Sequence, residues 1–159
     1  MGYLGSIEAG GTKFVCCVGT ENGEIIEKIS FPTMTPEKTI SNITSFFKDY
    51  KLDAIGIGSF GPVDLNKKSK TYGHITTTPK EHWRHFNFVG KIREHFPIPI
   101  GFSTDVNAAL LGETEWGAAK GYNSCIYMTV GTGIGIGVMV NDRLLQGLHH
   151  PEAGHIFVK

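Results

Sequence analysis

The chain has 159 residues and a mass of 17.4 kDa, which suits one domain, or one domain with part of another. Fifteen Lys and Arg balance fifteen Asp and Glu, so no basic field favours nucleic acid as the main partner. No apolar run approaches the ~20 residues that cross a bilayer, and we expect no signal peptide, because no basic region followed by a long apolar stretch opens the sequence. We therefore expect a soluble, cytoplasmic protein without a membrane partner, and its 40% of hydrophobic residues is enough for a core.

Glycine and cysteine are the informative residue types. The 21 glycines are about twice the usual share of ~7%, and such an excess is typical of backbone that bends sharply or approaches a ligand. Three cysteines, two of them adjacent in an apolar run, do not suggest a disulfide framework. We interpret Cys16 and Cys17 as small buried hydrophobic residues, which fits a reducing compartment.

The first part of the chain predicts an antiparallel meander and a helix. Apolar runs at 3–7 and 14–18 flank a Gly-Gly turn, and an Asn-Gly turn at 22–23 precedes a third run at 24–31. The Thr-Pro-Glu stretch at 35–37 is typical of a helix start, with Thr as N-cap and Pro at the first helical position. Apolar residues then recur at helical spacing, at Ile40, Ile43, Phe46, Phe47 and Tyr50.

Alternating strands and helices follow. We predict strands at 54–58 and 98–102 and helices at 88–96 and 105–116. The polar segment at 64–80, which contains several Lys and Thr, is expected to form an exposed excursion.

The end of the chain predicts one more hairpin, with strands at 125–130 and 134–140. The order β-β-β-α-β-α-β-α, followed by β-turn-β, indicates an α/β layered sheet. We expect a first α/β domain at 1–117 and the beginning of a second, incomplete domain at 118–159. A strand, glycine turn and strand occur near residue 10 and again near residue 132, which suggests a fold-level repeat.

Both glycine turns could bind phosphate. The turn Gly10-Gly11-Thr12-Lys13 could present backbone N–H groups with a hydroxyl and a cation, although a Gly-Gly turn alone favours a plain hairpin. The second turn, at 131–133, lies between two strands rather than between a strand and a helix. This placement argues against a dinucleotide-binding turn and for a second hairpin of the same kind.

Two further segments carry candidate residues. Asp105 stands where a strand meets a helix, a position where α/β proteins place ligands, but Asp there is more often a helix N-cap. His149, His150 and His155 suggest a metal site, yet Pro151 interrupts them and no helix aligns them, so at most one is expected to be a ligand.

The order of these motifs is more specific than any single one. The chain contains, in sequence, a GGT hairpin, the loop GSFGPV, the junction TDVNAA, the hairpin VGTGIG and the segment HPEAGH. This set resembles the ROK family of sugar kinases, which has the hexokinase-type, ribonuclease H-like/actin-like ATPase fold. EAGGTKF, GSFGP and TDVNAAL are most similar to its bacterial fructokinase branch. The resemblance runs from Gly5 to His155 and implies a kinase that converts fructose and ATP to fructose 6-phosphate and ADP.

The resemblance also implies roles for the matching residues. Asp105 falls on the catalytic base, and Glu8 lies near the expected Mg²⁺, where many relatives have Asp. The ATP phosphates would lie between the two turns, formed by Gly10, Gly11, Thr12 and Lys13 and by Gly131, Thr132 and Gly133. The sugar pocket would include Gly61, Pro62, Thr104, Asp105, Asn107, Glu152 and His155.

A structural zinc and a longer polypeptide are the remaining expectations. His155 matches the histidine that ligates zinc in this family and lies beside the sugar. The chain has no CxxC pair, so the other zinc ligands are expected outside residues 1–159. An apolar strand that ends near Lys159 would leave an uncovered edge, so we expect a C-terminal remainder of the same protein as a partner. Because family members are often dimers, a homodimer is also among the expected assemblies.

Other interpretations stay open. Thr104 stands where many glucose-type relatives have Asn, a departure that bears on hexose identity, so mannose or glucose is an alternative substrate. A repressor of the same family would need a helix-turn-helix ahead of the first strand, and too few residues precede it here. A catalytically silent sugar-binding or actin-like module is a third interpretation, against which Asp105 argues.

Overall fold

A five-stranded sheet forms the centre of the molecule. The computed structural model describes residues 2–131 and 133–146. In the sheet order β3-β2-β1-β4-β7, the first three strands are antiparallel, and β4 and β7 run parallel to β1. The bounds are Tyr3–Ala9 for β1, Lys13–Gly19 for β2, Ile25–Pro32 for β3, Leu52–Ser59 for β4 and Ile100–Thr104 for β7.

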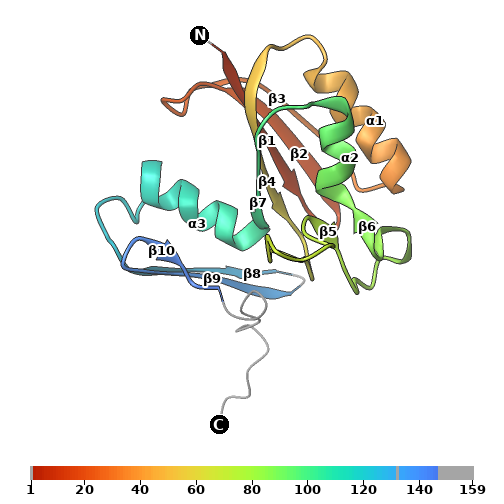
Figure 1. The fold of residues 1–159 in the computed structure, drawn as a ribbon. Helices are drawn as coiled ribbons and strands as arrows, with labels where there is room; N and C mark the ends of the chain where they lie inside the picture. Colours follow the sequence, from red (N-terminus) through yellow and green to blue (C-terminus); the bar gives the residue numbers. More distant parts are fainter. Residues whose placement is uncertain (1, 132, 147–159) are drawn as a thin grey trace.

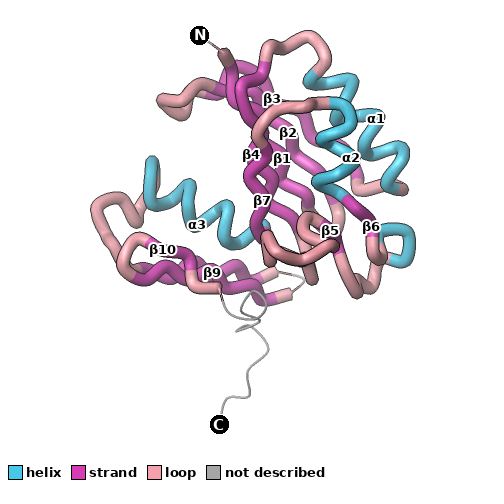
Figure 2. Tube along the Cα trace, in the orientation of Figure 1, coloured by secondary structure: helices cyan, strands magenta, loops and turns pink. Residues whose placement is uncertain are grey.

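Three α-helices and a second, smaller sheet complete the layers. Helices α1 (Pro36–Phe47) and α2 (Phe88–His95) lie on one face of the central sheet, and α3 (Asp105–Trp116) lies on the other side (Figure 1). Figure 2 shows α3 between the central sheet and the second sheet. That sheet has the order β10-β9-β8, with β8 at Cys125–Val130, β9 at Ile134–Val140 and β10 at Arg143–Leu144.

The predicted strands and helices occur in the predicted order, with the two-residue strands β5, β6 and β10 in addition, and the mixed α/β fold class is confirmed. Helix α3 contacts β8 and β9 as well as β4 and β7, so it packs against both sheets. Helix α3 falls within the predicted first unit, 1–117, and its contacts connect that unit to the second sheet.

The core lies between the central sheet and helices α1 and α2. Strand β1 alternates strictly: Ile7 and Ala9 are buried, while Ser6 and Glu8 are exposed on the face toward α3. This alternation follows from the two-residue period of a strand and gives the sheet one apolar and one more polar face.

We predicted that the polar segment at 64–80 would be exposed, but the structure buries part of it. Strand β5 (His74–Ile75) pairs with β6 (Phe86–Asn87), and a 3₁₀ turn, η1 (Glu81–Trp83), connects them. Ile75 is fully buried and Trp83 is 2% exposed. The Trp83 ring contacts four aromatic rings of the core, those of Phe14, Phe60, Phe86 and Phe88. Contacts with residues distant in the sequence therefore hold this polar segment against the sheet.

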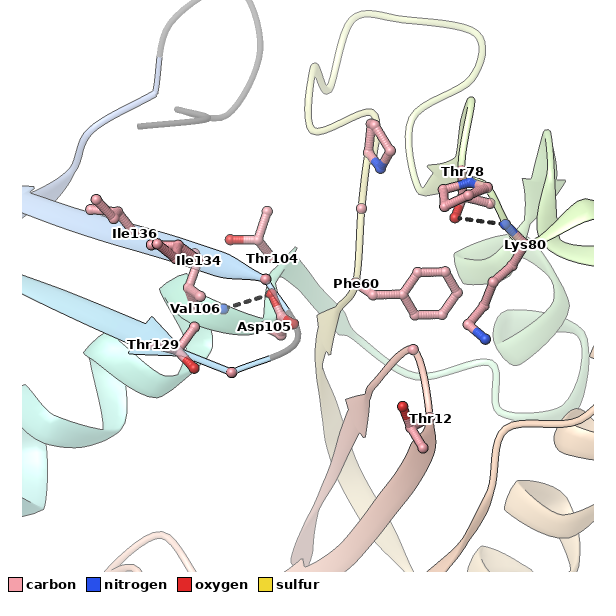
Figure 3. Close-up of a pocket in the computed structure, with 17 residues that line it drawn as sticks. Thr12, Phe60, Thr78, Lys80, Thr104, Asp105, Val106, Thr129, Ile134 and Ile136 are labelled. Carbon is pink, nitrogen blue, oxygen red and sulfur yellow. Dashed lines mark hydrogen bonds between the residues drawn. The ribbon is translucent and has the colours of Figure 1, made fainter. Parts of the chain in front are cut away.

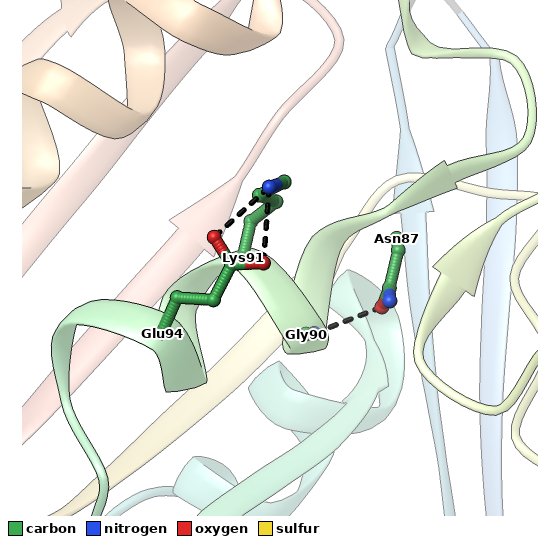
Figure 4. A network of polar contacts seen from close by, with 4 residues as sticks. All are labelled: Asn87, Gly90, Lys91 and Glu94. Carbon is green, nitrogen blue, oxygen red and sulfur yellow. Dashed lines mark hydrogen bonds and ion pairs between the residues drawn. The ribbon is translucent and has the colours of Figure 1, made fainter.

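Local polar contacts define the start of α2 (Figure 4). Asn87 is the N-cap, and its Oδ1 accepts a hydrogen bond of 2.9 Å from the Gly90 amide. Lys91 and Glu94 form an exposed ion pair at 2.9 Å, which contributes no more than about 1 kcal/mol because water screens it.

No helix within residues 2–131 and 133–146 is long and apolar enough to cross a membrane.

Candidate active site

A cleft of about 950 Å³ lies between the two sheets (Figure 3). Its walls come from the β1–β2 turn, the loop after β4, the segment before η1, the first turn of α3 and the β8–β9 hairpin. The volume lies in the upper part of the range that small-molecule sites occupy, roughly 300–1,000 Å³. Segments that are far apart in the sequence thus converge on one ligand-sized space.

Asp105 lies in this cleft as the first residue of α3. The N-cap is Thr104, whose hydroxyl accepts a 3.3 Å hydrogen bond from the Asn107 amide. The interpretation of Asp105 as the N-cap is therefore wrong, and its carboxylate instead accepts a bond of 2.9 Å from the Val106 amide. The helix N-terminus places a partial positive charge beside the carboxylate.

Glycines allow the first turn of α3 to approach both sheets closely. A Cβ at Gly58 of β4 would lie 2.6 Å from the Ala108 Cβ and 3.3 Å from the Asp105 Cα. On the other side, a Cβ at Gly137 of β9 would lie 2.9 Å from the Val106 carbonyl oxygen. Any larger side chain at these positions would push the helix and its carboxylate away. Packing, rather than ligand contact, therefore explains this part of the glycine-rich hairpin.

The first predicted phosphate turn contributes two of its four residues to the cleft. Gly11 and Thr12 line it. The Gly10 amide donates a 2.9 Å hydrogen bond to the Lys13 carbonyl and closes the hairpin. Lys13 is exposed at the start of β2 and is not among the cleft-lining residues, so the structure does not bring its side chain to the site.

The second turn lines the same cleft through Gly131 and Gly133, whereas Thr132 lies outside the described residues. The Gly131 amide donates a 3.0 Å hydrogen bond to the Gly133 carbonyl within the turn. The two glycine turns, more than a hundred residues apart in sequence, thus lie at one site, as the repeat suggested.

Only some of the predicted sugar-pocket residues line the cleft. Gly61, Pro62 and Thr104 line the cleft. Asn107 is 1% exposed, and its Nδ2 donates a 3.2 Å hydrogen bond to the Ser103 hydroxyl, so it faces the α3–β9 contact rather than the cleft. Glu152 and His155 lie outside the described residues.

Glu8 lies near Asp105 on the sheet face that α3 covers. It is exposed and pairs in register with Gly58, the residue on which the first turn of α3 rests. Mg²⁺ in phosphoryl-transfer sites is held by one or two carboxylates together with phosphate oxygens. Asp105 supplies one such carboxylate in the cleft, whereas Glu8 is not among the residues that line it and lies on β1, beside Gly58 of β4.

The residues that the structure describes do not form a zinc site. Residues 2–131 and 133–146 contain no group of three or more His, Cys, Asp or Glu side chains that could hold a metal. The predicted ligand His155 lies outside them.

Lys80 is a cleft residue that the sequence analysis did not single out. Its Cε lies 3.4 Å from the position that a Cβ at Gly11 would take, so its side chain lies beside the β1–β2 turn. In the sequence it stood at the end of a segment expected to be exposed, and only the burial of the neighbouring Trp83 brings it to the cleft.

Comparison with known proteins gives matches along almost the whole chain. The model of the ROK family matches residues 4–159. A Bacillus subtilis (strain 168) protein is 60% identical over 156 residues, which make up 98% of this chain and 52% of that protein. A Streptococcus mutans fructokinase is 51% identical over 156 residues, 97% of this chain and 53% of the enzyme. The chain thus spans about half the length of the curated relatives it matches.

A solved structure shares the fold. The ROK family glucokinase from Streptomyces griseus, determined in complex with glucose and AMPPNP, superimposes with a TM-score of 0.80 at 28% identity. The match covers 95% of this chain and 48% of that one. With a family match over nearly its whole length and a shared fold, the chain belongs to the ROK family.

Proposed function

We propose that the complete protein transfers the γ-phosphoryl group of ATP to a hexose, with fructose as the first candidate. The observation that carries this proposal is the Asp105 carboxylate at the N-terminus of α3, in a cleft lined by both glycine turns. The 51% identity to the Streptococcus mutans fructokinase supports fructose over other hexoses.

Asp105 acts as the general base in this proposal. Its carboxylate accepts the proton of the sugar 6-hydroxyl as that oxygen attacks the γ-phosphorus. ATP supplies the phosphoryl group, and Glu8 would lie near the Mg²⁺ that accompanies it, an ion that would neutralise phosphate oxygens. Gly11, Thr12, Gly131 and Gly133 let the phosphates approach the backbone and stay oriented. Phe60 and Pro62 also line the cleft, and their apolar side chains would reduce the space for water that hydrolyses ATP.

A coupled ATP/ADP assay of the complete protein with fructose, mannose and glucose tests the proposal. Asp105→Asn keeps the size of the side chain but removes its basicity, so kcat should fall by about 10²–10⁴-fold. Asp49→Asn, an exposed position after α1, is the matched control and should keep the wild-type rate. A near-normal kcat for Asp105→Asn would refute the base assignment.

The same assay separates the alternatives. A higher kcat/KM for glucose or mannose than for fructose would make the protein a different hexose kinase. Absence of turnover with every hexose, combined with measurable hexose binding, would favour a sugar-binding or actin-like module.

The proposal also includes a structural zinc with His155 as one ligand and the other ligands in the part of the protein beyond residue 159. Metal analysis of the complete protein should then find close to one zinc per chain, and a protein without zinc would contradict this part. We further propose that residues 1–117 form the first domain, that 118–159 begin the second, and that the protein works in the cytoplasm. Sedimentation of the complete protein tests for a homodimer.

A further inference from the structure

We propose that the Lys80 ammonium binds the terminal phosphate of the nucleoside triphosphate, a role that the Gly-Gly-Thr-Lys motif had suggested for Lys13. This inference rests on the proposed function, because it assumes that the cleft holds a nucleotide. It adds a positioning cation from the segment before η1, because Lys13 of the first glycine turn does not line the cleft.

The distribution of charge in the cleft is the first observation. Among the described residues that line it, Lys80 is the only cation and Asp105 the only anion. Figure 3 shows them on opposite sides of the Phe60 side chain, with Thr12 below the Phe60 ring. A substrate pair made of a neutral sugar hydroxyl and an anionic phosphate matches this separation, with the hydroxyl at Asp105 and the phosphate toward Lys80.

The short distance between Lys80 and the β1–β2 turn is the second observation. The Lys80 Cε lies 3.4 Å from the position of a Cβ at Gly11, which places the ammonium beside the Gly11–Thr12 backbone. No ion pair of Lys80 occurs within residues 2–131 and 133–146, so no carboxylate in this part of the chain neutralises it. A half-buried lysine beside a glycine turn, with no ion pair in the described part of the chain, is suited to bind an anionic oxygen.

The backbone under Lys80 is held firmly. Its carbonyl accepts a 2.9 Å hydrogen bond from the Trp83 amide, and the Trp83 indole donates a 2.9 Å bond to the Met34 carbonyl. The Arg84 Nε donates a 2.8 Å bond to the carbonyl of Thr78, which is 1% exposed. Since the chain on both sides of Lys80 is anchored, binding a phosphate orders only the lysine side chain, which limits the entropy cost.

Charge removal in the complete protein tests the inference. Lys80→Met keeps the aliphatic stem and removes the charge, Lys80→Arg keeps the charge, and Lys68→Met removes an exposed charge from the loop between β4 and β5 as the control. For Lys80→Met, we expect kcat/KM for ATP to fall by at least about tenfold, the loss expected for one charge-assisted hydrogen bond. The KM for the hexose should stay close to wild type, Lys80→Arg should recover most of the loss, and Lys68→Met should show none.

Direct binding provides a readout that does not depend on turnover. Lys80→Met should weaken binding of the non-hydrolysable analogue AMPPNP by about tenfold while leaving adenosine, which lacks phosphates, with its wild-type affinity. Unchanged AMPPNP affinity overturns the inference, as does an equal loss for adenosine, because the latter would indicate a structural effect. If the wild-type protein phosphorylates no hexose but its AMPPNP affinity still depends on Lys80, the proposed function fails while the lysine assignment stands.

Discussion

At the scale of single residues, Thr104 caps helix α3 and Asp105 faces the cleft. The sequence alone could not assign these two roles. Either side chain can cap a helix, and both stand at the same strand–helix junction. In the structure the Thr104 hydroxyl accepts the bond from the Asn107 amide, and Thr104 itself is 4% exposed. The Asp105 carboxylate therefore lies at the N-terminus of the helix and faces the cleft. The angle at which the strand enters the helix decides which of the two adjacent residues caps the helix and which faces the cleft. The sequence alone does not give that angle.

Cys16 is a second residue whose chemistry depends on its environment. Burial raises the pKa of its thiol to about 12, with a smaller contribution from Cys17 beside it. The thiolate is the reactive form, so Cys16 is inert at neutral pH, in agreement with its interpretation as a small hydrophobic residue.

This pKa shift predicts a loss of stability in alkaline solution. Below pH 9 the thiol is protonated in both the folded and unfolded chain and favours neither state. Above pH 9 it ionises only in the unfolded chain until the pH reaches about 12, so the free energy of unfolding falls by up to about 1.4 kcal/mol per pH unit.

Urea unfolding of the wild type and of Cys16→Ala across this pH window measures the effect. The wild type should lose stability with pH more steeply than Cys16→Ala, while Cys125→Ala, at a half-buried thiol, should follow the wild type. Parallel slopes for the wild type and Cys16→Ala would show that the thiol is not protected by burial.

At the scale of elements, the close approach of α3 to β4 is the feature that positions the site. Gly56 and Gly58 both belong to β4 and to the sheet face toward α3, but only Gly58 lies under the helix. A Cβ at Gly58 would meet Ala108 at 2.6 Å, whereas nothing lies within 4 Å of a Cβ at Gly56.

These two glycines form a matched pair of test positions. Gly58→Ala should displace α3, destabilise the protein by about 1–3 kcal/mol as overpacking does, and lower kcat by moving Asp105. Gly56→Ala should leave the free energy of unfolding and kcat close to wild type. Chemical denaturation and steady-state kinetics of both variants measure the difference, and equal effects from the two substitutions would disprove the proposed role of the contact.

The elements that could be predicted from the sequence are those with a local pattern. Examples are the apolar period of the first helix, the Asn-Gly turn and the apolar runs around the glycine turns. The structure contains the elements that such patterns predict, namely α1, β1–β4, α2, β7, α3, β8 and β9. Strands β5 and β6 have two residues each, too few to show a period. The burial of Trp83 depends on Phe14 and Phe60, which are distant in the sequence, and no local pattern reveals it.

The same distinction applies to the candidate site. Asp105 and the glycine turns could be found because each belongs to a recognisable local motif. Lys80 could not, since its place in the cleft depends on the aromatic cluster that fixes the neighbouring Trp83. Lys13 was named because it adjoins the glycines in the sequence, yet a residue next to a turn in a strand can point away from the space that the turn borders.

At the scale of the whole molecule, the second sheet has one covered and one open face. Cys125 and Tyr127 are half-buried, while Ile126, Met128 and Val130 are 67%, 57% and 74% exposed on the opposite face of β8. Three adjacent apolar side chains on one sheet face mark a surface that another element covers. Because the chain spans about half the length of its curated relatives, we expect the remainder of the complete protein to cover this face.

Thiol labelling of an introduced cysteine tests this expectation. Met128→Cys should react quickly with a maleimide in a chain of residues 1–159 and at least about tenfold more slowly in the complete protein, where packing restricts access to the thiol. Lys68→Cys, exposed in the loop after β4, should react at the same rate in both and serves as the control. Peptide mass analysis distinguishes the introduced thiol from Cys17 and Cys125. The face is covered only if the rates at residue 128 differ between the two proteins, so equal rates would mean that the remainder packs elsewhere and leaves β8 open to another partner.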